Sequence, residues 1–169
     1  MSLFSITREI GIDAGHRVTY HGSKCRNIHG HRYTVFATVR GTLATTGEEE
    51  GMVQDFAFLK HVMMAEIDEP CDHGLILWAE DPLLRTMNSL QHTQEDIATI
   101  LESLSWVESS WEGGKLYILD SVPTAENLAR HWYERMAPRI AEETNGRGQL
   151  ASVLVYETPN CSAEYPARV

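Results

Sequence analysis

The sequence has few cysteines and no long apolar run. Only 3 of its 169 residues are cysteine, which is too few for the disulfide framework of a small secreted protein, so we expect reduced thiols. No apolar run approaches the ~20 residues that a membrane helix needs, and the N-terminus lacks the basic and then apolar layout of a signal peptide. We therefore expect a soluble, cytoplasmic protein with no membrane partner.

Positive charge is also scarce. Lys and Arg total 14 against 24 Asp and Glu, for a net charge of −10. Non-specific binding of nucleic acid needs a basic face to neutralise phosphates, so we expect no nucleic-acid partner. Repeats, low-complexity tracts and linkers rich in Pro, Gly or Ser are missing too. A chain of this length buries one core, so we expect residues 1–169 to form a single domain.

The apolar periodicity predicts an α+β fold. Alternation of apolar and polar residues predicts strands over residues 3–16, 29–40 and 150–159. An apolar stripe of helical spacing follows Asp55 and another follows Thr124, and both residue types are good N-caps. This order favours an antiparallel sheet with helices on one face.

Residues 79–121 carry mixed signals. The patterns over residues 81–90 and 95–104 are helical, whereas residues 115–120 alternate like a strand after two glycines. This segment therefore adds elements whose placement the sequence does not specify.

Three histidines are concentrated near the predicted strand ends. His29 and His31 are two residues apart on one strand and therefore share a face. His16 ends the preceding strand, and antiparallel pairing across residues 17–28 brings all three together. Three imidazoles with an open fourth position are typical of catalytic zinc, which we favour over iron or copper because no redox partner is evident. The alternatives are ordinary hydrogen-bonded histidines, or a structural site closed by Cys25.

The order of several motifs is similar to that of the 6-pyruvoyltetrahydropterin synthase superfamily, and most like its bacterial 6-carboxytetrahydropterin synthases of queuosine biosynthesis. The three-residue gap between Cys25 and His29 resembles that bacterial branch. The matching motifs are His16, Cys25-x-x-x-His29-Gly30-His31, Gly51-Met52-Val53-Gln54-Asp55-Phe56, Asp72-His73, Pro123-Thr124-Ala125-Glu126-Asn127 and Tyr156-Glu157-Thr158.

The resemblance implies the tunnelling fold, or T-fold. Such a domain has a four-stranded antiparallel sheet with two helices on one face, and its subunits join edge to edge into an oligomeric β-barrel, usually a hexamer. A homo-oligomer of this kind would cover the exposed sheet edges of a single chain. Residues 79–121 would be an expanded region of the single T-fold domain.

The resemblance also implies a zinc-dependent lyase. Zn²⁺ held by His16, His29 and His31 would act as a Lewis acid on the side-chain hydroxyls of 7,8-dihydroneopterin triphosphate. Cys25 would be the catalytic base, with its thiolate favoured by neighbouring positive charge. Asp72-His73 would be a second proton-transfer pair, the alternative being a simple helix-terminal turn on the surface. We expect a turn before this pair, since Pro70 cannot continue the preceding helix.

Five further residues are candidates for binding the substrate. Glu157 shares the face of the apolar residues of its strand, so its carboxylate needs a partner, either the pterin N–H groups or an arginine, unless it is simply exposed at the strand end. Thr124 and Glu126 match the family's pterin site, although capping of a helix explains them equally well. Lys24 and Arg26, with other arginines near the histidines, are expected to receive the triphosphate unless they are simply solvated.

Other possibilities remain open. The reaction could stop at 6-pyruvoyltetrahydropterin, or the chain could be a non-catalytic pterin or zinc-binding module. Cys71 is the alternative reactive thiol because it precedes Asp72, but Cys71 and Cys161 are better explained as small buried apolar residues.

Overall fold

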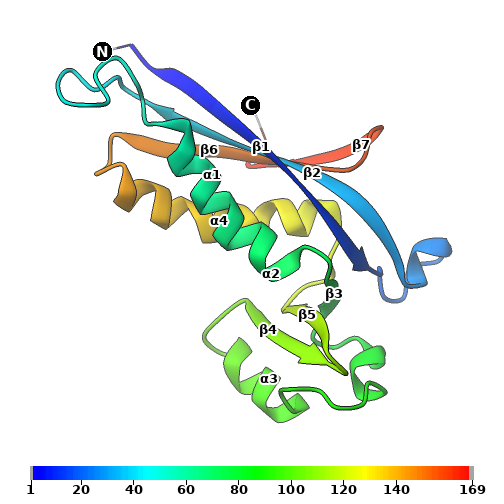
Figure 1. Ribbon diagram of the computed structural model, residues 1–169. Coiled ribbons are helices and arrows are strands. Elements are labelled where there is room, and N and C mark those ends of the chain that lie inside the picture. The colour runs from blue at the N-terminus through cyan, green and yellow to red at the C-terminus, as the bar shows by residue number, and fades with distance from the viewer. Residues whose placement is uncertain (1, 168–169) are drawn as a thin grey trace.

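A single mixed sheet of seven strands organises the chain (Figure 1). The computed structural model describes residues 2–167. In space the strands follow the order β4-β5-β3-β1-β2-β6-β7. Their bounds are β1 Phe4–His16, β2 His29–Gly41, β3 Leu75–Trp78, β4 Trp106–Trp111, β5 Gly114–Leu119, β6 Gly148–Thr158 and β7 Cys161–Tyr165.

The centre of the sheet confirms the three predicted strands. β1 and β2 pair antiparallel along their whole length, and β6 pairs antiparallel with β2. Alternate side chains of these strands are buried and form most of the sheet's contribution to the core. One face of the sheet is covered and the other is open, and this is why apolar and polar residues alternate along these strands in the sequence.

The expectation of four antiparallel strands is wrong in two respects. The sheet has three additional strands, and β3 runs parallel to both β1 and β5. β3 and β7 have only four and five residues, which is too short for a clear period-two signal. Parallel neighbours need a long crossover; β2 and the helices after it lie between β1 and β3, and α3 (Gln94–Leu101) and β4 lie between β3 and β5.

Two helices cover one face of the central strands (Figure 1). α1 (Phe56–Met63) is capped by Asp55, and α4 (Ala125–Glu143) is capped by Thr124, as the sequence predicts. Their buried stripes pack against β1, β2 and β6 in the larger of two apolar clusters. Among residues 2–167, none of the helices combines the length and apolarity needed to cross a membrane.

The chain continues as a helix past the predicted turn at Pro70. α1 passes into a π-helical turn over Met64–Asp68 and then into α2 (Glu69–Cys71), which contains Pro70. The expectation that Pro70 ends the helix is therefore wrong, because a proline is tolerated where a new helical turn starts. The reversal comes at His73, whose φ is 55°.

Residues 79–121 form a smaller layer with its own apolar cluster. Only Pro82–Arg85 of the predicted helix over residues 81–90 is helical, as a 3-10 turn, whereas α3 (Gln94–Leu101) and β5 follow the predicted pattern. β4 was not predicted, and it pairs with β5 as an antiparallel hairpin. The apolar cluster between these elements comprises Leu77, Leu84, Ile97, Val107, Leu116 and Ile118.

A buried polar group connects α4 with the smaller layer. His131 is 4% exposed, its Nε2 lies 2.8 Å from the Tyr117 hydroxyl, and its Nδ1 lies 3.4 Å from the Ser105 hydroxyl. Burial, reinforced by Arg135 and Arg130, lowers the pKa of His131 from 6.5 to about 3. The imidazole is therefore neutral at physiological pH.

This buried imidazole predicts a specific loss of stability in acid. Between pH 6.5 and about 3 the unfolded chain binds a proton at His131 that the folded chain does not, so the free energy of unfolding falls with decreasing pH by about 1.4 kcal/mol per unit. In His131→Gln we expect the free energy of unfolding, measured with urea from pH 6.5 to 4.5, to depend less steeply on pH. The slope should be smaller by about 1.4 kcal/mol per pH unit, which corresponds to one proton. His61→Gln, on the exposed face of α1, should keep the wild-type slope. Equal slopes in all three proteins would contradict the prediction.

Candidate functional site

The three histidines predicted as metal ligands meet at one end of the β1–β2 pair. The Cα register places His16 opposite His29, and Ala14 opposite His31. All three side chains lie on the face of the sheet that the helices cover, and one ring nitrogen from each lies within 4.8 Å of the others. His16 is almost fully buried, with a side chain that is 1% exposed, whereas His29 and His31 are partly exposed.

Backbone carbonyls orient two of the three rings. Nδ1 of His16 lies 2.8 Å from the carbonyl oxygen of Pro123, and Nδ1 of His29 lies 2.8 Å from that of Asn27. In each pair the Nδ1–H donates to the carbonyl, so Nε2 keeps its lone pair. Nε2 of His16 and Nε2 of His31 are buried without a hydrogen-bond partner among residues 2–167.

The electrostatics of the cluster fit a bound cation. Burial lowers the pKa of His16 and of His31 below the ordinary histidine value, and neutral imidazole is the form that binds a metal. An unpartnered buried nitrogen costs about 1–3 kcal/mol, and one metal ion would satisfy the two unpartnered nitrogens of His16 and His31 while also binding His29. The chemistry of this donor set therefore suits a divalent metal ion.

Glu157 points toward the same cluster. Its Oε1 lies 3.4 Å from Nε2 of His16 and 3.8 Å from Nε2 of His31, and its side chain is 27% exposed. No arginine pairs with Glu157 in the part of the chain that the structure describes, so the alternative of an internal arginine salt bridge is wrong. The carboxylate is partly open to solvent and remains accessible to a ligand.

Asp72 and His73 lie on a turn next to the end of β1. Oδ1 of Asp72 accepts a hydrogen bond of 2.8 Å from the Asp13 N–H, and Oδ2 lies 2.7 Å from Nδ1 of His73. This hydrogen bond from Asp13, with a further contribution from His73, lowers the pKa of Asp72. The carboxylate holds the proton of His73 on Nδ1, so Nε2 of this exposed imidazole is free to exchange a proton. His73 and His31 line the same open hollow.

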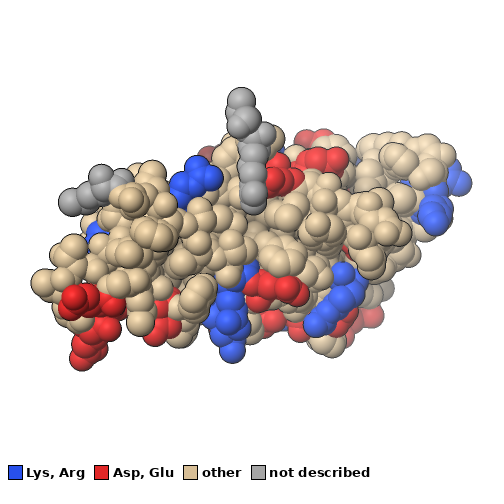
Figure 2. All heavy atoms as spheres, turned by 90° about the horizontal axis from the view of Figure 1, so that it is seen from above, with Lys and Arg blue, Asp and Glu red and all other residues tan. Residues whose placement is uncertain are grey.

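Cys25 lies in the loop that joins the histidine-bearing strand ends. It forms a short 3-10 helix with Lys24 and Arg26, and its own side chain is partly exposed. Figure 2 shows basic side chains at this tip of the molecule, and both Lys24 and Arg26 are exposed there without an ion-pair partner in the described chain. These two charges are therefore free to bind an anion.

Two other arginines near the histidines already have carboxylate partners. Arg17 donates through Nε to Oδ2 of Asp81 over 2.7 Å, and a second nitrogen of Arg17 and the Thr19 hydroxyl also bind this fully buried carboxylate. Arg32 pairs with Asp13 on the open face of the sheet. Of the four basic residues around the histidines, Lys24 and Arg26 are thus the better candidates for binding phosphate.

The other two cysteines differ from one another. Cys71 is fully buried, and burial raises the pKa of its thiol well above the ordinary value. It is therefore an unreactive apolar residue, and the alternative assignment of Cys71 as the reactive thiol is disfavoured. Cys161 is exposed on β7, so the expectation that it is buried is wrong, because β7 is an edge strand.

The start of α4 approaches the cluster through its capping residues. The Thr124 hydroxyl accepts a hydrogen bond from the Asn127 N–H, so its capping role is real. Glu126 is exposed in the first helical turn. Pro123 immediately before the cap contributes the carbonyl that orients His16.

The sequence interpretation missed several groups around the histidines. The Pro123 carbonyl and the Asp81 carboxylate could not be found from local patterns, because their contacts join distant segments. The Asn27 carbonyl, by contrast, lies only two residues before its partner His29. Tyr33 could have been found, since it follows His31 by two residues on the same face. It is fully buried against the rings of His16 and His31, and its hydroxyl has no partner among residues 2–167.

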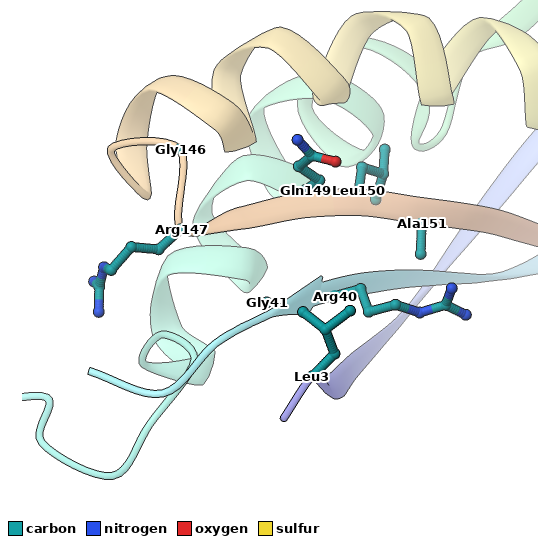
Figure 3. Close-up of a pocket in the computed structure, with 8 residues that line it drawn as sticks. All are labelled: Leu3, Arg40, Gly41, Gly146, Arg147, Gln149, Leu150 and Ala151. Carbon is teal, nitrogen blue, oxygen red and sulfur yellow. The ribbon is translucent and has the colours of Figure 1, made fainter. Parts of the chain in front are cut away.

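A second hollow lies at the opposite end of the long strands (Figure 3). It is lined by Leu3, Arg40, Gly41, Gly146, Arg147, Gln149, Leu150 and Ala151. The side chains of Arg40 and Arg147 extend away from one another, and Arg147 binds Glu49 and Gln54 instead of facing the hollow. β1 spans about 40 Å at ~3.3 Å per residue, so this hollow is remote from the histidines.

Comparisons with known proteins agree with this geometry. A family model described as 6-pyruvoyl tetrahydropterin synthase matches residues 5–168. A 6-carboxy-5,6,7,8-tetrahydropterin synthase from Rickettsia bellii is 34% identical over 162 residues, which cover 96% of this chain and 99% of the relative.

Two solved structures share the fold. An uncharacterized protein from Wolinella succinogenes superposes with a TM-score of 0.72 at 24% identity, covering 97% of this chain and 98% of that one. The 6-pyruvoyl tetrahydropterin synthase of Plasmodium vivax gives a TM-score of 0.61 at 17% identity and covers 97% of each chain. The architecture is therefore the T-fold, here with a seven-stranded sheet in one chain.

The histidine cluster predicts metal binding that depends on each imidazole. We expect the purified protein to bind one divalent metal ion per chain, and His29→Ala to lower the affinity by more than about 100-fold, because a direct ligand contributes more than an outer-shell partner. His29 is chosen because it is partly exposed. Elemental analysis and competition with a chromophoric chelator measure the effect, with exposed His61→Ala as the control. Unchanged affinity in His29→Ala would contradict the prediction.

Proposed function

Because the chain belongs to the 6-pyruvoyl tetrahydropterin synthase family, we propose that it is a zinc-dependent 6-carboxy-5,6,7,8-tetrahydropterin synthase. Its substrate would be 7,8-dihydroneopterin triphosphate, and its products 6-carboxytetrahydropterin, acetaldehyde and triphosphate. The observation that carries the proposal is the convergence of three imidazole nitrogens within 4.8 Å beside the Glu157 carboxylate. The relatives named for this reaction support the choice of product.

The metal site would supply Lewis acidity. His16, His29 and His31 would hold Zn²⁺, which polarises hydroxyl and carbonyl oxygens without changing its own redox state. The unpartnered Nε2 atoms of His16 and His31 support this assignment. The carbonyls of Pro123 and Asn27 would keep two of the rings in the ligating tautomer.

The protein's own groups would move the protons. Cys25 would remove a proton from a side-chain carbon of the substrate, since a thiolate is a competent base and its side chain is partly exposed. His73 would exchange a second proton through Nε2, because Asp72 holds the other ring nitrogen protonated. These transfers would permit loss of the triphosphate. Consumption of one water and cleavage of the carbon–carbon bond would then release acetaldehyde.

The substrate's two ends would bind different groups. Glu157 would accept the 2-amino and ring N–H hydrogen bonds of the pterin, with Thr124 and Glu126 at the start of α4 beside it. Lys24 and Arg26 would receive the triphosphate. Both residues are exposed in the loop between β1 and β2, which supports a binding mode in which the phosphates remain close to solvent.

The wider context is part of the same proposal. Residues 1–169 would form one T-fold domain, acting in the cytoplasm in queuosine biosynthesis. The edge strands of the sheet, β4 and β7, expose backbone groups that pairing with other copies would satisfy. A homo-oligomeric barrel, hexameric by resemblance, is therefore the proposed assembly.

Identification of the product tests the reaction. We expect zinc-loaded protein and 7,8-dihydroneopterin triphosphate to yield acetaldehyde and 6-carboxytetrahydropterin by mass spectrometry. Cys25→Ala should lower the rate by about 100-fold or more, the usual contribution of a general base, with Cys161→Ala as the matched control. An intact three-carbon side chain would indicate the 6-pyruvoyl product instead. No turnover by the wild-type protein would favour a non-catalytic pterin-binding module.

Charge reversal tests the phosphate site. We expect Lys24→Glu combined with Arg26→Glu to raise KM by at least about 100-fold, because two charge-assisted contacts of about 1.5–3 kcal/mol each are lost. Lys60→Glu combined with Arg85→Glu changes the net charge equally at other exposed positions and should leave KM within about twofold of wild type. An unchanged KM in the first double variant, measured by steady-state kinetics, would remove these residues from the site.

A further inference from the structure

Lys115 connects the smaller layer to the turn that carries Asp72 and His73. It lies on β5, and its Nζ donates one hydrogen bond of 2.7 Å to the carbonyl oxygen of Asp72 and another of 2.8 Å to that of Glu69. The Glu69 carbonyl belongs to α2, so the ammonium lies at the C-terminal end of a helical segment, where positive charge is favoured. A single side chain therefore binds two backbone carbonyls of the segment that leads into the chain reversal at His73.

The turn itself adopts a conformation that must be held in place. His73 has a φ of 55°, a region that a non-glycine residue enters at a cost and occupies only where its surroundings enforce it. The hydrogen bonds within the turn are few, with Gly74 N–H donating to the Cys71 carbonyl over 3.1 Å. The remaining support must come from neighbouring elements.

Those supports come from two opposite sides. From β1, Asp13 donates its N–H to the Asp72 carboxylate and accepts the His73 N–H over 2.7 Å. From β5, Lys115 holds the Asp72 carbonyl, and its stem lies beside Gly74, where an added Cβ would approach the Lys115 Cδ to 3.1 Å. The turn is therefore clamped between a strand of the main layer and a strand of the smaller one.

We propose that Lys115 is a positioning residue, which fixes the orientation of the Asp72–His73 pair by bridging the carbonyls of Glu69 and Asp72. Lys115 itself need not touch the substrate. The inference rests on the function proposed above, in which His73 exchanges a proton with the substrate, and it gives residues 79–121 a role in the reaction. Loss of the bridge would loosen the turn and displace the imidazole, while the proposed metal ligands, which β1 and β2 carry, keep their arrangement.

The test compares four zinc-loaded proteins: wild type, Lys115→Met, Lys115→Arg and Lys60→Met. Methionine keeps the apolar stem beside Gly74 but cannot donate a hydrogen bond, and arginine restores a donor. Lys60→Met removes one positive charge at an exposed position on α1 and is the matched control. Steady-state kinetics, zinc content and backbone hydrogen exchange of the peptide covering residues 69–76 are measured on each protein.

We expect Lys115→Met to lower kcat by about 10- to 100-fold, the usual effect of removing a group that orients a functional one. KM and zinc content should stay within about twofold, and exchange should accelerate in residues 69–76 alone. Lys115→Arg should recover most of kcat, and Lys60→Met should match wild type. If Lys115→Met does not fold, Lys115→Gln, which is too short to bridge both carbonyls, takes its place.

Two results would overturn the proposal. The first is that Lys115→Met has the same kcat and the same hydrogen exchange as wild type. The second is that its kcat falls together with a proportional loss of zinc, or with faster exchange throughout the chain. If the wild-type protein shows no turnover, the proposed function fails by itself. The exchange comparison then decides whether Lys115 holds the turn, and unaltered exchange in residues 69–76 would show that it does not.

Discussion

The antiparallel register of β1 and β2 is the constraint on which the candidate site depends. It places His16 opposite His29 and leaves His31 on the same face. A slip of one residue would turn His29 and His31 to the other face of the sheet. Buried neighbours farther along the strands, such as Ile12 paired with Tyr33, resist that slip because it would also expose them.

Segments from the whole chain converge on this end of the sheet. The start of α4 brings the Pro123 carbonyl to His16, the end of β6 brings Glu157, and the turn before β3 brings His73 beside the hollow lined by His31. Each arrives because its element is fixed by the apolar core or by pairing in the sheet, not by contacts within the site. The functional groups are therefore arranged by a scaffold that extends well beyond them.

The sequence predicted features that arise from local periodicity. Long alternating strands, the caps Asp55 and Thr124 and the meeting of three histidines all follow from spacing along one segment. The helical path through Pro70 was missed because a proline is tolerated at the first positions of a new helical turn, whereas the parallel strand β3 was missed because it depends on pairing between distant segments. The same reason applies to the Asp81 carboxylate, whose partner Arg17 is 64 residues away in the sequence.

The presence of two separate apolar clusters has a consequence for how the protein fluctuates. Each cluster can form a cooperative unit, and Tyr117 and Leu119 of β5 are buried in the larger one, so residues 81–104 can open while β5 stays with the larger core. Such an opening would break the Asp81–Arg17 contact and leave the Lys115–Asp72 contact on β5 in place. Thermal breathing of a segment that contributes no proposed metal ligand would thus reach Arg17, the neighbour of His16, and spare the turn that carries His73.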